Sequence, residues 1–181
     1  MRQEDKDTLL GLLDRMRNGG GLGSYVALDT GNESLRPLIC YGNCEYSELP
    51  QLASLDIVVP LLGKEVPPDL RVEDFDEHWA AVCRLEEDAE RMEDSVWDMV
   101  PKYLPRDEAQ FDVYSTLGSA EDPEVSVADV TIRLLRVMSI DLRRVVALLE
   151  EIWRSYYNDT EFSIRSDIEP KTKIVTKMRY D

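Results

Sequence analysis

The sequence predicts an α+β fold in which about four helices cover a mainly antiparallel sheet of short strands. Two observations lead to this fold class. Short apolar runs bounded by glycine, proline and polar turns alternate with amphipathic stretches, and the longest amphipathic stretch, 74–100, is strongly acidic. The length of 181 residues fits a single domain, 1–181. The polar segment 118–125 is where we expect any seam, between an acidic α+β part (1–120) and a helix–helix–hairpin part (121–181).

The first third of the chain predicts one helix and three strands. Residues 5–17 carry leucines at helical spacing and end at Gly19–Gly23, a cluster that suits a helix C-cap. Because these glycines follow a helix and precede a strand, the reverse of a phosphate-binding loop, they indicate a turn. Residues 24–30 and 35–41 flank a polar turn as in a hairpin, and 55–62 has the composition of a buried strand.

The long acidic stretch predicts a helix over 74–100, roughly 40 Å long at 1.5 Å per residue. Asp74 and Glu77 have the spacing of a capping box, and Pro101 stops the helix. Apolar side chains at steps of three and four form one predicted face: Phe75, Trp79, Val82, Leu85, Ala89, Met92, Val96 and Met99. The opposite face carries seven acids: Glu86, Glu87, Asp88, Glu90, Glu93, Asp94 and Asp98.

The last part of the chain predicts a strand at 111–117, two helices at 127–137 and 140–157, and a hairpin made of 162–165 and 173–177. Ser126 with Asp129 three residues later suits the N-cap of the first of these helices. Two tightly joined helices followed by a hairpin are the element order of a winged helix, which offers nucleic-acid binding as one alternative. The basic residues of this part would serve it: Arg133, Arg136, Arg143, Arg144, Arg154, Lys171, Lys173, Lys177 and Arg179.

Charge is the strongest indication of a partner. The formal net charge is −16, residues 1–120 carry −14 of it, and 65–98 alone holds 13 acidic and 3 basic side chains. Such a field repels nucleic-acid phosphate and anionic lipid, so direct nucleic-acid binding and membrane binding are disfavoured. It attracts a basic protein surface, including that of a nucleic-acid-binding protein. Acidity that only serves solubility is the competing interpretation.

The compartment follows from the cysteines and the apolar runs. An odd, low count of three cysteines fits free thiols in a reducing environment. The first residues lack the apolar region of a signal peptide, and the longest apolar run, 55–62, is much shorter than a bilayer span. We therefore expect a cytoplasmic protein.

Two metal sites can be drawn from the sequence. Cys40, Cys44, Cys83 and His78 reach the ligand count of a zinc site. Cys83 follows His78 by five residues on one predicted helix, however, so the two side chains face different directions. Cys40 or Cys83 with His78 would make a nucleophile and base only if the fold brought them together.

The second drawn site is magnesium held by the acids of 74–100. It requires a facing acidic set, and the nearest candidates have the wrong spacing: Asp141, Glu150 and Glu151. The sequence therefore predicts no catalytic residue, no metal and no cofactor, and it leans away from an enzyme.

The favoured hypothesis is a non-enzymatic binding protein that occludes or docks on a basic partner surface, as inhibitors, immunity proteins and counter-defence proteins do. The predicted partner-binding residues lie on the acidic helix: Glu86, Glu87, Glu90, Glu93, Asp94, Trp97 and Asp98. Trp79 and Trp153 lie on apolar stripes and are expected in the core, whereas Trp97 lies beside acids. An accessory subunit of a larger complex, the winged-helix nucleic-acid binder and a metal-dependent hydrolase remain alternatives, and a homo-oligomer stays open.

Overall fold

The computed structural model describes residues 1–19, 23–43, 54–63, 66, 75–119 and 125–168. Its regular elements follow in chain order: α1 (Gln3–Gly19), β1 (Tyr25–Asp29), β2 (Leu38–Asn43), β3 (Ser54–Pro60), α2 (Phe75–Met99), the 3₁₀ turn η2 (Val100–Lys102), β4 (Gln110–Ser119), β5 (Ser126–Leu135), the 3₁₀ turn η3 (Val137–Ser139), α3 (Leu142–Tyr157) and β6 (Ser163–Asp167).

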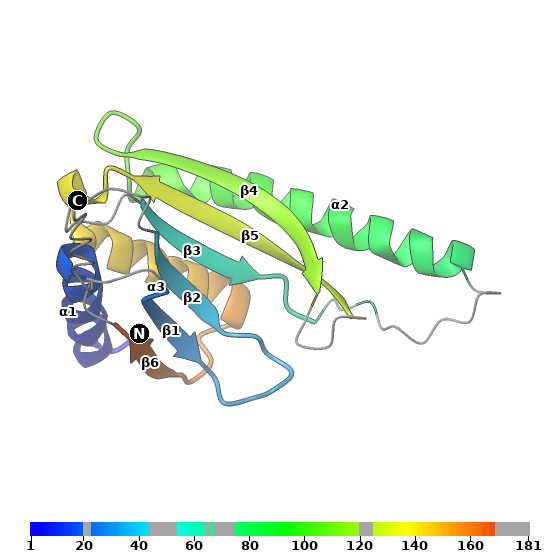
Figure 1. Ribbon diagram of the computed structural model, residues 1–181, viewed down its shortest axis with the longest axis horizontal. Coiled ribbons are helices and arrows are strands. Elements are labelled where there is room, and N and C mark those ends of the chain that lie inside the picture. Colours follow the sequence, from blue (N-terminus) through cyan, green and yellow to red (C-terminus); the bar gives the residue numbers. More distant parts are fainter. Residues whose placement is uncertain (20–22, 44–53, 64–65, 67–74, 120–124, 169–181) are drawn as a thin grey trace, which may run out of the picture.

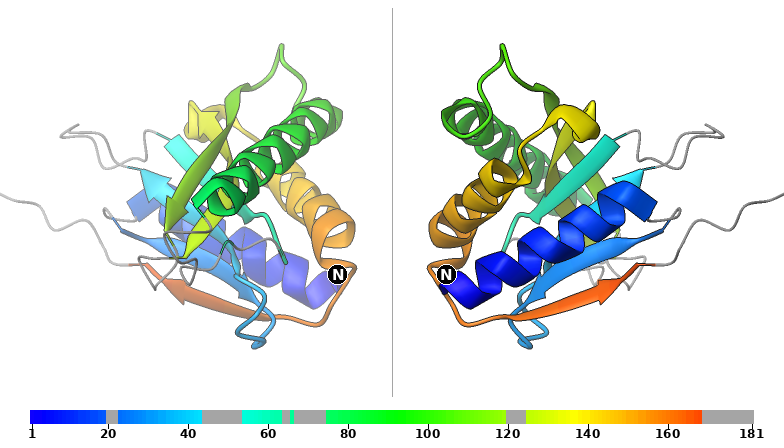
Figure 2. Two further views of the ribbon diagram at one scale, coloured as in Figure 1. Left: turned by 90° about the vertical axis from the view of Figure 1, so that its right-hand side faces the viewer. Right: turned by 90° about the vertical axis from the view of Figure 1, so that its left-hand side faces the viewer.

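The six strands form one sheet in the order β4-β5-β3-β2-β1-β6, and every neighbouring pair is antiparallel. The three described helices lie on the same face of this sheet, behind it in Figure 1 and to one side of it in Figure 2. The predicted α+β class with an antiparallel sheet is confirmed. The predicted number of helices is wrong, because the described residues form three helices instead of four.

The core lies between the sheet and the helices. Alternate residues of the inner strands point into it, because successive side chains of a strand face opposite sides. The strand contribution is Val26, Leu28, Leu38, Cys40, Leu55, Ile57, Val59, Val130, Ile132 and Leu134. The helices add Leu9, Leu13, Met16, Met92, Val96, Val145, Leu148, Leu149, Ile152 and Trp153. Trp153 is only 1% exposed, as its place on an apolar stripe predicts.

The predicted helix 127–137 is wrong: the segment forms β5, which pairs with β3 on one side and β4 on the other. Its apolar residues satisfy both periods, so a helical stripe can be drawn through this strand, in which Val127 and Thr131 on the outer side are buried as well as the core-facing residues. The β-branched content, which includes Val130 and Ile132, decides for the strand. Ser126 is accordingly the first residue of a strand and caps no helix. The winged-helix alternative falls with this helix.

The other predicted elements agree with the structure to within a few residues. The helices 5–17, 74–100 and 140–157 correspond to α1, α2 and α3, and the strands 24–30, 35–41, 55–62 and 111–117 correspond to β1, β2, β3 and β4. Residues 162–165 begin near β6, while 173–177 lie outside the described residues. Most of the expected seam, 118–125, also lies outside them, so the single-domain organisation stays a prediction.

Candidate docking surface on helix α2

Helix α2 packs one side on the sheet and turns the opposite side outward. Its buried residues follow one line along the helix: Leu85, Ala89, Met92, Val96 and Met99. Met92, Val96 and Met99 belong to the main core, whereas Leu85 and Ala89 pack with Val66 and Ala128 in a smaller cluster. A helix turns by about 100° per residue, so this line fixes which side chains face away from the sheet.

The acids of α2 occupy the outward side over successive turns. Five of the seven predicted partner-binding residues are exposed: Glu86, Glu87, Glu90, Asp94 and Asp98. We call these five residues the acidic face. Among the described residues, Arg91 is the basic residue of this helix that forms ion pairs. Its Nη2 lies 3.7 Å from a Glu87 oxygen and its Nη1 lies 3.3 Å from an Asp88 oxygen. Nine acids and two arginines over Phe75–Met99 leave α2 with a net charge of −7.

The other two predicted partner-binding residues contact the chain itself. The backbone N–H of Ser115 donates a 2.8 Å hydrogen bond to Glu93 Oε2, so Glu93 satisfies an outward amide of the edge strand β4. The Trp97 ring packs against Phe111 with centroids 5.5 Å apart, and the Arg106 guanidinium lies 5.5 Å from the Trp97 ring. Both side chains are half-buried and tie α2 to β4 and to the turn that precedes it.

Trp79 contradicts the expectation that it lies in the core, because 61% of its surface is exposed. On the helix it is rotated by roughly 120° from the line of Leu85 and Val96, on the flank that also carries Glu86 and Glu93. Farther along the same flank Trp97 is covered by Phe111 and Arg106. The stripe drawn from the sequence is thus wider than the buried line, and Trp79 lies at its exposed margin.

The structure does not bring the drawn metal and catalytic sets together. Within the described ranges, no group of three or more His, Cys, Asp or Glu side chains has the arrangement of a metal site. The acids that would have faced α2 pair elsewhere: Asp141 with Arg143, Glu150 with Lys6, and Glu151 with Arg154.

The described cysteines and the histidine lie in different environments. Cys40 lies in the core, where burial raises the pKa of its thiol to about 12, so it is a poor ligand and nucleophile. Cys83 and His78 are half-buried on α2, and His78 Nδ1 has no hydrogen-bond partner among the described residues. Cys44 lies outside the described residues.

Sequence reasoning missed a groove on the sheet face that the helices leave open. The groove has a volume of about 940 Å³, and its apolar floor consists of Pro37, Ile39, Tyr41, Val58 and Pro60. One wall is the ion pair of Arg165 with Asp29 at 2.8 Å. The other is Arg36, whose Nη1 lies 2.7 Å from Asp129.

Arg36 is held from both sides of the sheet. Its Nη2 donates to the Ala128 carbonyl at 2.9 Å, and its own carbonyl accepts a 2.6 Å hydrogen bond from the Tyr157 hydroxyl at the end of α3. The groove residues come from five strands (β1, β2, β3, β5 and β6) and from segments outside them, so no local sequence pattern could have identified them.

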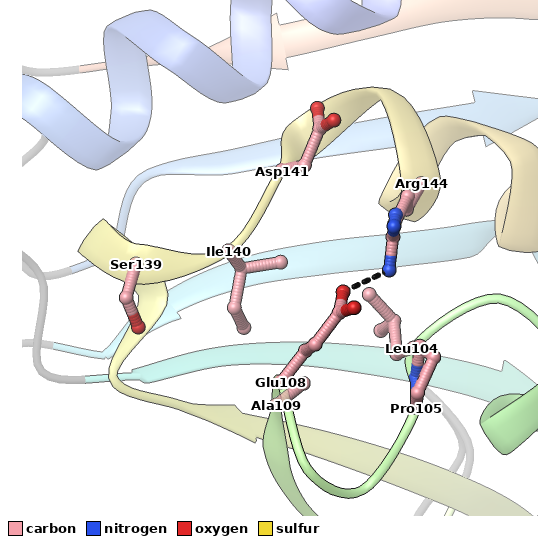
Figure 3. Close-up of a pocket in the computed structure, with 8 residues that line it drawn as sticks. All are labelled: Leu104, Pro105, Glu108, Ala109, Ser139, Ile140, Asp141 and Arg144. Carbon is pink, nitrogen blue, oxygen red and sulfur yellow. Dashed lines mark hydrogen bonds and ion pairs between the residues drawn. The ribbon is translucent and has the colours of Figure 1, made fainter.

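A second, much smaller cavity of about 120 Å³ lies where the segment before β4 meets the start of α3 (Figure 3). Glu108 and Arg144 point toward each other across it and form an ion pair. Asp141, on its rim, caps α3 by accepting from the Arg143 backbone N–H at 3.0 Å. Glu108 is paired with Arg144 and Asp141 with the neighbouring Arg143, so the charged residues described here already have partners.

Comparison with known proteins adds no assignment. No described helix has the length and apolar character needed to cross a membrane. No protein-family model matches the chain, and neither the curated proteins nor the solved structures contain a match to it.

Proposed function

We propose that the protein is a non-enzymatic binding protein that docks the acidic face of α2 on a basic surface of another protein, in the manner of an inhibitor, immunity or counter-defence protein. The observation that carries the proposal is the outward run Glu86, Glu87, Glu90, Asp94 and Asp98, in which Arg91 is the one base that pairs with an acid among the described residues. Like charges on adjacent turns of a helix destabilise it slightly, so a surface of this kind costs stability unless a cation covers it.

Electrostatics and an aromatic anchor support docking over solubility alone. Opposite potentials accelerate encounter and select against wrong partners. Tryptophan is enriched among the residues that dominate binding energy, and Trp79 is 61% exposed beside the acidic flank. The partner surface that fits is thus basic, with an apolar or guanidinium contact for Trp79 at one end.

Charge reversal tests the proposal with a matched control. The docking variant replaces four residues of the acidic face by lysine: Glu87, Glu90, Asp94 and Asp98. The control variant replaces four exposed acids of other elements by lysine: Glu4, Asp7, Asp107 and Glu161. Both variants change the net charge from −16 to −8, so they differ only in where the charge lies.

Each protein is immobilised and incubated with lysate of the native host, and bound proteins are identified by mass spectrometry at low and high salt. We expect a basic partner on the wild type and on the control variant, lost from the docking variant and weakened by salt. Equal capture by both variants would refute docking through α2. Capture that survives high salt and requires Trp79 would instead favour an accessory subunit held by apolar contacts.

A further inference from the structure

The open face of the sheet is apolar at its centre, although none of the described helices covers it (Figure 1). Antiparallel sheets with one solvated face usually place polar residues on that side. Here cross-strand pairing aligns Ala27, Ile39, Val58, Thr131 and Tyr114 in one row across five strands. Ile39 and Val58, the part of this row on β2 and β3, belong to the groove floor.

The next row on the same face adds two tyrosines. Tyr25 pairs with Tyr41 across β1 and β2, and their ring centroids are 6.5 Å apart. Tyr41 is 39% exposed and reaches into the groove. Asp167 continues this row as the cross-strand neighbour of Tyr25. Aromatic faces beside a carboxylate attract an ammonium or guanidinium group.

Around the groove the described positive side chains are already in ion pairs, whereas some described negative side chains are not. Three described arginines lie on the open face, and each is already paired: Arg36 with Asp129, Arg133 with Asp56, and Arg165 with Asp29. Glu33 on the groove margin and Asp167 beside Tyr25 are exposed and have no ion-pair partner among the described residues. Among the described residues the face therefore has spare negative charge and no spare positive charge, which disfavours phosphate-rich ligands and favours cationic ones.

We propose that this groove binds a polypeptide segment of a partner protein in which apolar side chains are flanked by lysine or arginine. The apolar side chains lie on Ile39, Val58 and Pro60, and the flanking cations reach Glu33, Asp167 and the tyrosine rings. A second copy of this chain is a poor occupant, because two chains of net charge −16 repel each other. The site goes beyond the proposed function, since α2 lies on the opposite side of the sheet (Figure 2).

The test uses three blocked hexapeptides and the full chain labelled with ¹⁵N. One peptide alternates leucine with lysine, the second leucine with glutamate, and the third serine with lysine. Backbone amide shifts of Ile39, Tyr41 and Val58 report binding in the groove at 150 mM salt. We expect saturable shifts with the leucine–lysine peptide alone, because the groove requires both apolar contact and positive charge.

Variants separate the two contributions. Tyr41→Ser should weaken the leucine–lysine peptide by about 5- to 30-fold, the range for a central aromatic contact. Glu33→Gln combined with Asp167→Asn changes two exposed carboxylates to amides of the same shape and should weaken binding of this peptide by about 3-fold. The fourfold lysine variant of α2 should bind the peptide within about 2-fold of wild type, since the intervening distance is screened.

Three results would overturn the proposal. Groove amides that stay unshifted at saturating leucine–lysine peptide would show that the groove binds no such segment. If the leucine–glutamate peptide bound equally well, the groove would recognise apolar side chains without regard to charge. If the serine–lysine peptide bound equally well, the groove would recognise positive charge without apolar contact. Because α2 takes no part in this measurement, failure here and failure of the docking proposal are independent results.

Discussion

The thiol of Cys40 lies in the core, and burial raises its pKa to about 12. An unfolded cysteine ionises near pH 8.5 to 9, so above that pH the unfolded chain loses a proton that the folded chain keeps. Stability is therefore lost as pH rises, by up to about 1.4 kcal/mol per pH unit. We expect a free energy of unfolding in urea that is about 1–2 kcal/mol lower at pH 10 than at pH 8.5.

Two variants assign this pH effect to one thiol. Cys40→Ala should flatten the dependence between pH 8.5 and 10, while Cys83→Ala should retain it. The measurement stops at pH 10 because burial also raises the pKa of Tyr157, which adds its own effect at higher pH. Identical slopes for Cys40→Ala and wild type would contradict the assignment.

Arg133 and Asp56 join β5 to β3 on the open face. Arg133 Nε donates to Asp56 Oδ1 at 2.9 Å and Nη2 donates to Oδ2 at 2.8 Å, and the guanidinium lies 5.6 Å from the Tyr114 ring. The hydrogen bonds to Asp56 raise the pKa of Arg133 above its ordinary value. Lysine cannot form this planar, two-point contact.

Arg133→Lys should therefore destabilise the protein by about 1 kcal/mol, a modest figure because the arginine side chain is 38% exposed. A double-mutant cycle of Arg133→Met and Asp56→Asn, followed by urea unfolding, should give a coupling energy of about 1 kcal/mol. Additivity within about 0.3 kcal/mol would mean that the pair contributes nothing measurable.

At the scale of elements, sequence patterns within a short window predicted the helices whose ends and apolar faces depend on neighbouring residues. The apolar spacing and the proline that follows Met99 agree with the extent of α2, and α1 ends at Gly19, where the glycine run begins. Such patterns could not separate the strand β5 from a helix, because Val127 and Thr131 on its outer side are buried and the alternation of exposed and buried residues is weakened. The pairing of β5 with β3 and β4 joins residues far apart in the chain, so a short stretch of sequence cannot predict it.

The exposure of Trp79 gives a direct test of how α2 lies on the sheet. Trp153 is 1% exposed and Trp97 is covered by Phe111 and Arg106, so Trp79 should dominate collisional quenching of tryptophan fluorescence. The acids near Trp79 attract caesium and repel iodide. We expect efficient quenching by caesium, weak quenching by iodide, and loss of most caesium quenching in Trp79→Phe. Unchanged quenching in Trp79→Phe would mean that the Trp79 ring is buried.

For the molecule as a whole, the two proposed binding surfaces differ in how much of each a local sequence pattern can define. The acidic face lies on a single helix, so spacing along the chain was enough to define it, apart from Glu93 and Trp97, which turn back to β4. The groove combines β1, β2, β3, β5, β6 and the loop before β2, and its ion pair of Arg36 and Asp129 joins residues 93 positions apart. Such a site exists only once the strand order is known.

The net charge of −16 makes a last prediction about stability. Like charges repel most strongly in the compact state, so raising salt should stabilise the fold by screening them. For a chain of this size a gain of about 1 kcal/mol raises the melting temperature by about 2–4 °C. We expect a rise of that order between 10 and 300 mM sodium chloride, measured by circular dichroism.

The fourfold lysine variant of α2 locates the repulsion. If the acidic face is its main source, this variant should melt higher than wild type at low salt and respond less to added salt. The control variant with lysine at Glu4, Asp7, Asp107 and Glu161 has the same net charge and should keep more of the salt response. Equal salt responses of the two variants would mean that repulsion is spread over the molecule, and the acidic face would then cost too little stability to indicate a partner.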